Sequence, residues 1–191
     1  DSILLWALRL YLGKTKPRVV AIVGSVGKTS TTQAIGTVLA EKYRVRVTRR
    51  NYNTVRGVVA TVFGRDTAST TLGWMWFVKM VILRAVFTRP NFDVLVLELG
   101  TDKPGDIAEF AFLKPELAVV TAITPEHMEF FGSEENVAKE ELTIATYAAK
   151  LLVNADLVSD DNLARYAGNI PVVRYGSNQQ YTMQNGEFKL G

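Results

Sequence analysis

Short, continuous apolar runs recur along the chain, and segments with helical spacing separate them. The run from Val19 to Val23 consists mainly of β-branched residues, which is typical of a strand buried on both faces. Further strands are expected at residues 45–49, 93–100, 117–123, 151–154 and 171–175, and a hairpin turn at 185–186. Helices are expected at residues 3–12, from 28, from 58, at 72–87, from 104, at 133–149 and at 160–167. This alternation predicts an α/β fold with a mostly parallel sheet and helices on both faces.

The junction between the first strand and the helix after it carries the strongest chemical signal. Gly24 and Gly27 end the apolar run, and Lys28 and Thr29 open the helix. Glycines let backbone N–H groups approach phosphate oxygens, and the helix N-terminus adds a partial positive charge. The lysine can reach a terminal phosphate, and the threonine hydroxyl can ligate a phosphate-bound magnesium ion. The predicted phosphate loop consists of Gly24, Ser25, Val26, Gly27, Lys28, Thr29 and Ser30.

This loop is shorter than the standard P-loop. The usual pattern has a glycine five positions before the Gly-Lys pair, where Ile22 stands in this chain. A tight turn with an exposed lysine is therefore the alternative interpretation. The flanking strand and helix, together with the Lys-Thr pair, favour the phosphate-binding interpretation.

Two further side chains fall at predicted carboxyl ends of strands, where doubly wound sheets bind their ligands. Glu98 ends the run that starts at Asp93, and a carboxylate there is a candidate magnesium ligand. The alternative is a glutamate that simply points into solvent. His127, the one histidine of the chain, follows the strand at 117–123 and has acids on both sides. It is either a ligand or a structural hydrogen-bonding residue.

Composition narrows the class of protein. The 191 residues suit one domain with a substantial core, and 48% of them are hydrophobic, which argues against disorder. The absence of cysteine excludes disulfides and thiolate metal sites and fits a cytoplasmic protein. Residues 42–92 hold ten Lys or Arg and one acid, whereas residues 93–141 hold twelve acids and three lysines. An anionic small substrate with magnesium explains both halves better than a nucleic acid does.

Two apolar segments, at residues 3–12 and 72–87, raise the question of a membrane. Both are shorter than the roughly twenty residues that span a bilayer, and the second contains Lys79 and Arg84. We expect helices that pack on the domain or on a partner. Attachment of the second segment to a membrane surface is the less favoured interpretation, based on its tryptophans and basic residues.

With these motifs in place, the chain resembles the central, ATP-binding domain of the Mur ligase family. The resemblance covers roughly residues 19–175 and rests on five motifs in the same order. They are Gly24-Ser25-Val26-Gly27-Lys28-Thr29-Ser30, Asn51-Tyr52-Asn53-Thr54 with Gly57, Leu97-Glu98-Leu99-Gly100 with Gly105-Asp106-Ile107, His127-Met128-Glu129-Phe130-Phe131-Gly132-Ser133, and Asn154-Ala155-Asp156. The most similar subgroup adds D-alanyl-D-alanine to UDP-N-acetylmuramoyl-tripeptide.

The resemblance implies an ATP-dependent carboxylate–amine ligase that works through an acyl phosphate in peptidoglycan precursor synthesis. It implies ATP and Mg²⁺ as cofactors, with Lys28, Glu98 and His127 as catalytic residues. The implied metal ligands are Thr29, Glu98, His127 and Glu141, and the implied substrate-binding residues are Asn51, Asn53 and Thr54. Alternatives are a relative that ligates a folate or an amino-acid polymer, and a non-catalytic nucleotide-binding or scaffold protein.

Three departures from the family pattern qualify this expectation. The position of the family's carbamoylated lysine, which supports a second metal, is Glu141 in this chain. Its shorter carboxylate arm either binds the metal through water or leaves that site weakened, and Lys139 would face elsewhere on its helix. The ATP-binding domain is predicted at residues 19–191. In typical members a sugar-binding domain precedes it, whereas here only a predicted helix and linker at residues 1–18 do. The chain also ends before a carboxy-terminal domain. We therefore expect this domain to work together with the missing amino- and carboxy-terminal domains. We also expect this piece alone to bind nucleotide weakly and not to complete ligation.

Overall fold

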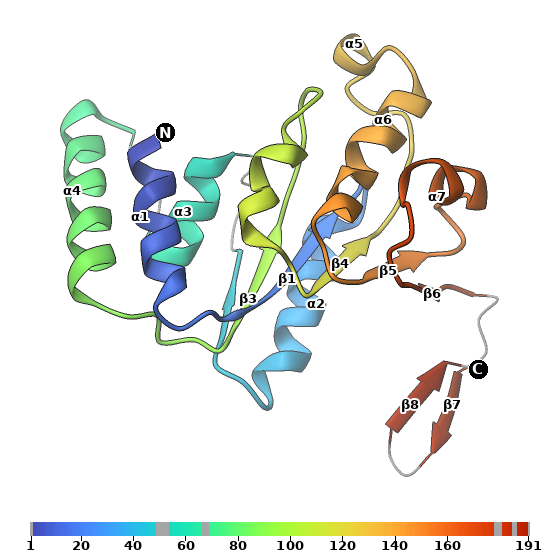
Figure 1. The fold of residues 1–191 in the computed structure, drawn as a ribbon, viewed down its shortest axis with the longest axis horizontal. Coiled ribbons are helices and arrows are strands. Elements are labelled where there is room, and N and C mark those ends of the chain that lie inside the picture. The colour runs from blue at the N-terminus through green and yellow to red at the C-terminus, as the bar shows by residue number, and fades with distance from the viewer. Residues whose placement is uncertain (1, 49–53, 66–68, 178–180, 185–186, 191) are drawn as a thin grey trace.

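A sheet of six parallel strands forms the centre of the protein (Figure 1). The computed structural model describes residues 2–48, 54–65, 69–177, 181–184 and 187–190. The strands are β1 (Arg18–Val23), β2 (Val45–Val47), β3 (Val94–Glu98), β4 (Leu117–Val120), β5 (Leu151–Asn154) and β6 (Val172–Tyr175). They lie in the order β2-β3-β1-β4-β5-β6, and each neighbouring pair is parallel. The predicted fold class is confirmed.

Helices cover both faces of this sheet, but unequally. They are α1 (Ser2–Gly13), α2 (Lys28–Ala40), α3 (Val55–Phe63), α4 (Thr71–Phe87), α5 (Met128–Phe131), α6 (Glu134–Glu141) and α7 (Asp160–Tyr166), with the 3-10 segments η1 (Ile107–Leu113) and η2 (Leu142–Thr146). Successive side chains of a strand point to opposite faces. Ala21 and Val23 of β1 belong to the larger core, with buried residues of α1, α3, α4, α6 and α7. Val20 and Ile22 belong to a smaller core, against which Ile35 and Leu39 of α2 pack.

The strand order places a topological switch point beside β1. The chain leaves β1 through α2 for β2 at the edge of the sheet, returns through β3, and then crosses to β4 on the other side of β1. The connections that leave β1 and β4 therefore run in opposite directions. Open α/β sheets bind their ligands above the carboxyl ends of the strands at such a switch point.

Some predicted boundaries are wrong for local reasons. The helix expected from residue 58 begins at Val55, because Thr54 caps it and its Oγ1 accepts a hydrogen bond from the Gly57 N–H at 3.3 Å. The helix expected at 133–149 ends at Glu141 and continues as η2. The helix expected from residue 104 is the 3-10 segment η1, which starts at Ile107.

The first helix packs into the core beside the six-stranded sheet, whereas the last two strands form a separate two-stranded sheet. Helix α1 contributes the fully buried Ala7 and Leu8 to the larger core, so it is an integral part of this core. The domain boundary between residues 18 and 19 stays a prediction. Near the other end, β7 (Tyr181–Gln184) and β8 (Glu187–Leu190) pair antiparallel, as the hairpin pattern predicts, and the turn at 185–186 lies outside the described residues.

Candidate phosphate-binding site

The phosphate loop, residues 24–30, connects β1 to α2 at the switch point and is held against the segment that follows β4. The Ser25 N–H donates to the Ala122 carbonyl at 2.9 Å. The Ser25 hydroxyl donates to the Thr124 carbonyl and accepts from the Thr124 N–H, each at 3.0 Å. The Thr121 hydroxyl donates to the Val26 carbonyl at 2.7 Å. The loop is therefore fixed by contacts with residues about a hundred positions away in sequence.

Glycine is required at position 24 by both conformation and space. Gly24 has φ +123°, a region that L side chains rarely adopt. A Cβ atom there would lie 2.4 Å from Thr121 Oγ1 and 2.8 Å from the Ala122 carbonyl oxygen. Gly27, with φ +83°, sits at the N-cap position of α2. The backbone thus turns sharply into the helix N-terminus, where anions bind.

The Lys28 side chain lies over the loop instead of pointing away from the protein. Its Nζ atom donates to the Gly24 carbonyl and, at 3.2 Å, to the Ser25 carbonyl. An ammonium group is therefore already held at the concave side of the loop. Such a cation suits a phosphate group, which carries negative charge and offers several acceptor oxygens.

Thr29 and Glu98 meet although 69 residues separate them. Parallel pairing of β1 with β3 brings their carboxyl ends together, with Ile22 opposite Glu98. The Thr29 hydroxyl donates to Glu98 Oε1 at 3.1 Å. Glu98 is only 4% exposed, and its N–H donates to the Thr48 hydroxyl at 3.1 Å. A buried glutamate does not fit the solvent-exposed alternative. A hydroxyl and a carboxylate oxygen are the hard donors that magnesium prefers.

His127 occupies the loop after β4, in an unusual backbone conformation. Its φ of 46° lies in the left-handed region, which costs free energy for a residue with a side chain and which is often associated with functional sites. The ring nitrogens lie 3.7 Å from an Asp102 carboxylate oxygen and 3.9 Å from one of Glu129. A role as a metal ligand stays a prediction.

Glu141 reaches the phosphate loop from the end of α6. It is fully buried, and its Oε2 atom accepts a hydrogen bond from the Gly24 N–H at 2.8 Å. Lys139, two residues earlier, is exposed on the other side of the helix, as helical spacing predicts. The described geometry therefore gives Glu141 a definite task, which is to fix the backbone at the start of the loop. Its role as a metal ligand stays a prediction.

Burial raises the pKa of Glu141 to about 8, although the nearby Lys28 ammonium acts in the opposite direction. The carboxyl group of Glu126 lies close by and adds to the rise. One oxygen of each of these two carboxyls, Oε1, is buried without a hydrogen-bond partner. Keeping Glu141 protonated at neutral pH reduces the cost of placing the two acids together.

We expect the stability of the protein to fall between pH 4.5 and about 8 because of Glu141. The unfolded chain loses this proton near pH 4.5, whereas the folded protein keeps it to about pH 8, so unfolding releases a proton in this window. The free energy of unfolding should fall by up to about 1.4 kcal/mol per pH unit. Glu141→Gln, which retains an acceptor for the Gly24 N–H, should remove this slope. Urea unfolding at several pH values in magnesium-free buffer tests this, and Glu109→Gln, at an exposed glutamate, is the control. If the pH dependence of the free energy of unfolding were unchanged in Glu141→Gln, the titration would belong to another group.

The predicted substrate residues are placed only in part. Asn51 and Asn53 lie outside the described residues. The Thr54 hydroxyl caps α3 through the Gly57 N–H. In the described part of the chain, no group of three or more His, Cys, Asp or Glu side chains is arranged to hold a metal ion. Glu98 and Glu141 each hydrogen-bond a residue of the loop, Thr29 and Gly24, and they form no carboxylate–histidine cluster with His127.

Sequence reasoning missed three residues that shape the site. The Thr121 hydroxyl donates to the Val26 carbonyl of the loop, and Glu126 lies beside Glu141. Glu140 accepts hydrogen bonds from the backbone N–H groups of Gly105 and Ile107, both at 2.8 Å, and so ties α6 to the segment after β3. Glu126 could have been suspected from its place next to His127. The contacts of the other two depend on tertiary packing and leave no sequence signal.

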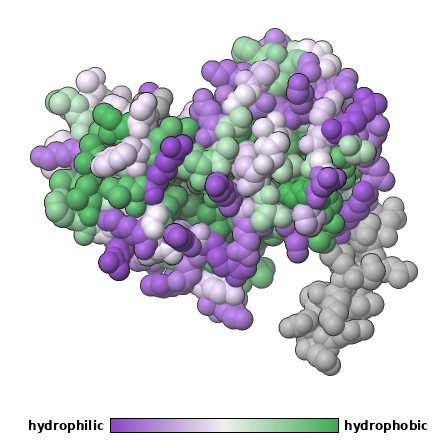
Figure 2. Space-filling model, viewed as in Figure 1, coloured by the Kyte–Doolittle hydropathy of each residue, from purple (hydrophilic) through white to green (hydrophobic). Residues whose placement is uncertain are grey.

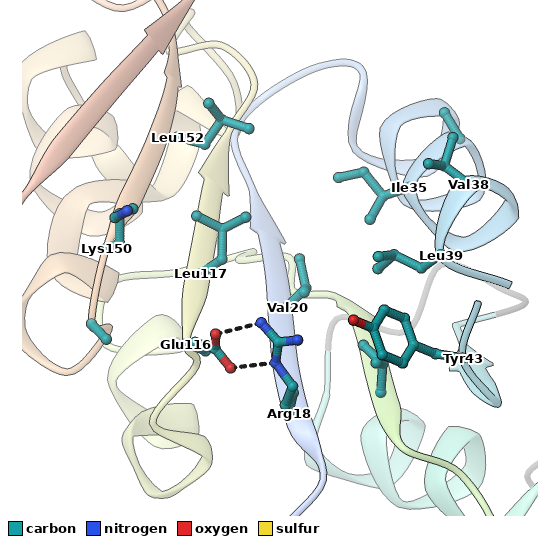
Figure 3. Close-up of a pocket in the computed structure, with 13 residues that line it drawn as sticks. Arg18, Val20, Ile35, Val38, Leu39, Tyr43, Glu116, Leu117, Lys150 and Leu152 are labelled. Carbon is teal, nitrogen blue, oxygen red and sulfur yellow. Dashed lines mark hydrogen bonds and ion pairs between the residues drawn. The ribbon is translucent and has the colours of Figure 1, made fainter. Parts of the chain in front are cut away.

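A large apolar cavity lies elsewhere. It measures about 680 Å³ and occupies the face of the sheet beside α2, towards the amino ends of the strands (Figure 3). Arg18 and Glu116 form a bidentate ion pair at its edge, with N–O distances of 2.6 and 2.7 Å, and Val20, Leu39 and Leu117 line its apolar wall. None of the phosphate-loop residues lines it, so it is the uncovered part of the second face of the sheet and not part of the candidate site.

Comparison with known proteins agrees with the motifs and geometry of the loop. The profile of the Mur ligase middle domain matches residues 22–190, which is most of the chain. The chain belongs to the Mur ligase family. The UDP-N-acetylmuramoyl-tripeptide–D-alanyl-D-alanine ligase of Bacillus subtilis is 29% identical over 167 residues, which are 87% of this chain and 29% of that protein. The chain therefore spans less than a third of the length of this Mur ligase.

Solved structures of Mur ligases share the fold. MurF from Acinetobacter baumannii superposes with a TM-score of 0.70 at 18% identity, over 99% of this chain and 39% of that one. MurF from Thermotoga maritima, solved in complex with ADP, gives a TM-score of 0.64 at 21% identity, over 100% of this chain and 41% of that one. At these identities the likeness concerns the fold.

Proposed function

We propose that this Mur ligase middle domain binds ATP and magnesium within an enzyme that joins a carboxylate to an amine in peptidoglycan precursor synthesis. The observation that carries this proposal is the arrangement at the switch point. The phosphate loop places Lys28 on its concave side, and Thr29 lies 3.1 Å from the buried Glu98. A tight turn with an exposed lysine would need none of these long-range contacts.

The residues present fit a nucleotide with its magnesium ion. Gly24 lets the loop pack closely against Thr121 and Ala122, and the backbone N–H groups that follow Gly27 form the N-terminus of α2, where an anion would bind. Thr29 and Glu98 would hold magnesium, and the ion would supply charge neutralisation at the β- and γ-phosphates. His127 and Glu141 are the proposed contributors to a second metal, and Glu141 would lose its proton on binding the ion. The subgroup that uses UDP-N-acetylmuramoyl-tripeptide is proposed from the Bacillus subtilis relative.

The protein's own residues then act by placement and charge. In the proposed reaction a carboxylate oxygen of the substrate attacks the γ-phosphorus, the bond to the β-phosphate oxygen breaks, and ADP leaves. Lys28 would stabilise the charge on the transferring group. The amine nitrogen then attacks the acyl carbon, phosphate leaves with the bonding electrons, and the amine loses a proton to solvent. Asn51, Asn53 and Thr54 are proposed to orient the carboxylate substrate.

An assay of the full-length protein tests this proposal. ADP release and amide formation, followed by mass spectrometry, should require ATP, magnesium, UDP-N-acetylmuramoyl-tripeptide and D-alanyl-D-alanine together. Glu98→Gln should lower kcat/KM by at least about 100-fold, because it removes the carboxylate that would hold the magnesium ion, which neutralises charge at the phosphates. Glu109→Gln, an exposed glutamate on η1, is the matched control and should retain activity.

Other outcomes separate the alternatives. Product formation only with a folate or an amino-acid polymer would keep the ligase class and replace the substrate. ATP binding with no amide product from any such pair would favour the non-catalytic interpretation. Unchanged kcat/KM in Glu98→Gln would contradict the proposed role of this residue.

A further inference from the structure

Helix α4 is apolar on all sides but is covered on only one. Phe77, Val81 and Ala85, spaced four residues apart, are its buried residues. The opposite side carries large apolar residues that are at least 43% exposed, and Trp76 and Phe87 are 69% and 78% exposed. This open face of α4 consists of Leu72, Met75, Trp76, Leu83, Val86 and Phe87. A helix that is apolar all round normally has a partner on every side.

Helix α1 extends the same apolar surface. It packs alongside α4, and Ile3, Trp6 and Leu10 remain exposed on it. Figure 1 shows the two helices side by side at one end of the molecule, and Figure 2 shows hydrophobic surface gathered over that end. Contiguous exposed apolar surface of this kind marks an interaction site. We refer to these exposed residues of α1 and α4 together as the α1/α4 face.

The charged residues on α1, α4 and the neighbouring α3 have one sign. Helices α1, α3 and α4 contain Arg9, Arg56, Lys79 and Arg84 and no Asp or Glu. The Lys79 ammonium lies 5.5 Å from the Trp76 ring, so a cation lies directly among the exposed apolar groups. Arg84 is fixed by a 2.8 Å hydrogen bond from Nη1 to the Phe63 carbonyl. An apolar surface that contains cations and tryptophan suits the interface of an anionic lipid bilayer.

We propose that the α1/α4 face binds the surface of an anionic membrane, with α4 lying in the plane of the interface. No helix in the described part of the chain is both long and apolar enough to cross a bilayer. A second copy of the chain fits less well. Two such faces would bring Lys79 and its neighbouring cations together, with no acid on these helices to compensate. This inference does not depend on the proposed ligase activity.

Vesicle binding of the full-length protein tests the proposal. Co-sedimentation with phosphatidylglycerol-containing vesicles should exceed that with pure phosphatidylcholine at least tenfold, and about 0.5 M salt should weaken it. Tryptophan fluorescence should shift to the blue, because Trp6 and Trp76 are exposed in solution. The double variant Trp76→Ser, Leu83→Ser should lose at least tenfold in binding, and Lys79→Glu should lose binding to anionic vesicles selectively.

Controls make the test decisive. Val38→Ser alters an equally exposed apolar residue on α2 and should bind vesicles as the unaltered protein does, as should Lys28→Ala. Circular dichroism of each variant checks that it is folded. Absence of binding to anionic vesicles, or equal binding by the double variant, would overturn the proposal. So would a dimer, seen by light scattering, that the double variant dissociates, since that would assign the face to a second copy.

Discussion

Gly24→Val is expected to destabilise the protein by more than about 3 kcal/mol, the largest stability effect that we predict for a single substitution in the loop. Two costs add. Valine at φ +123° is strained, and its Cβ would lie 2.4 Å from Thr121 Oγ1 and less than 3 Å from two backbone atoms of Ala122. Because Ala122 follows β4 in the core, its backbone has little freedom to move. Urea unfolding followed by circular dichroism measures the change.

Two other glycines separate the costs. Gly105 has φ +98°, and no atom lies within 4 Å of the Cβ that an alanine would add. Gly105→Ala therefore introduces backbone strain without a steric clash and should lower the free energy of unfolding by about 1 kcal/mol. Gly13→Ala has neither strain nor contact and should leave stability nearly unchanged or slightly raised. If Gly24→Val were no more harmful than Gly105→Ala, the close approach of the loop to the segment after β4 would be refuted.

Lys28→Ala is expected to lower the affinity of the full-length protein for Mg-ATP at least about 100-fold, equivalent to about 2.7 kcal/mol. The Nζ atom is held above the loop by the Gly24 and Ser25 carbonyls, where it would meet a terminal phosphate. Its removal takes away a charge-assisted contact that backbone amides cannot replace. Isothermal titration calorimetry measures the affinity directly.

The matched control is Lys139→Ala, which removes an exposed lysine on α6 and should not alter nucleotide affinity. Lys28→Ala should remain folded, because loss of the ammonium beside Glu141 raises the pKa of this already neutral acid still further. Equal affinity of Lys28→Ala and the unaltered protein would return the loop to the alternative interpretation, a tight turn with an exposed lysine.

Much of the fold was predictable because its signals are local. Five consecutive apolar residues before Gly24 predict the strand, and Lys28 and Thr29 directly after a glycine predict the start of the helix. The parallel sheet follows from the alternation of such units. The start of α3 was not predicted correctly, because a cap by Thr54 is worth only about one hydrogen bond, and Gly57 inside the first turn obscures the pattern.

The surroundings of the loop depend on contacts that no local pattern records. Glu141 was predicted as a substitute metal ligand, and the fold brings it 117 residues back to the N–H of Gly24. Burial there raises its pKa, which its neighbours in sequence do not reveal. Likewise, the apolar sequence of α4 could not show which side is covered, because its apolar residues occupy every side of the helix.

By itself the sequence determined the elements, the phosphate loop and the residue types that chemistry needs, because a strand, a glycine turn and a helix start are set by neighbouring residues. The tertiary structure decided which of these residues meet. Strand order placed β1 between β3 and β4, and this brought Thr29 to Glu98 and Ser25 to Thr124. It also decided that α4 keeps one face open, since burial is a property of the packed chain and not of any one segment.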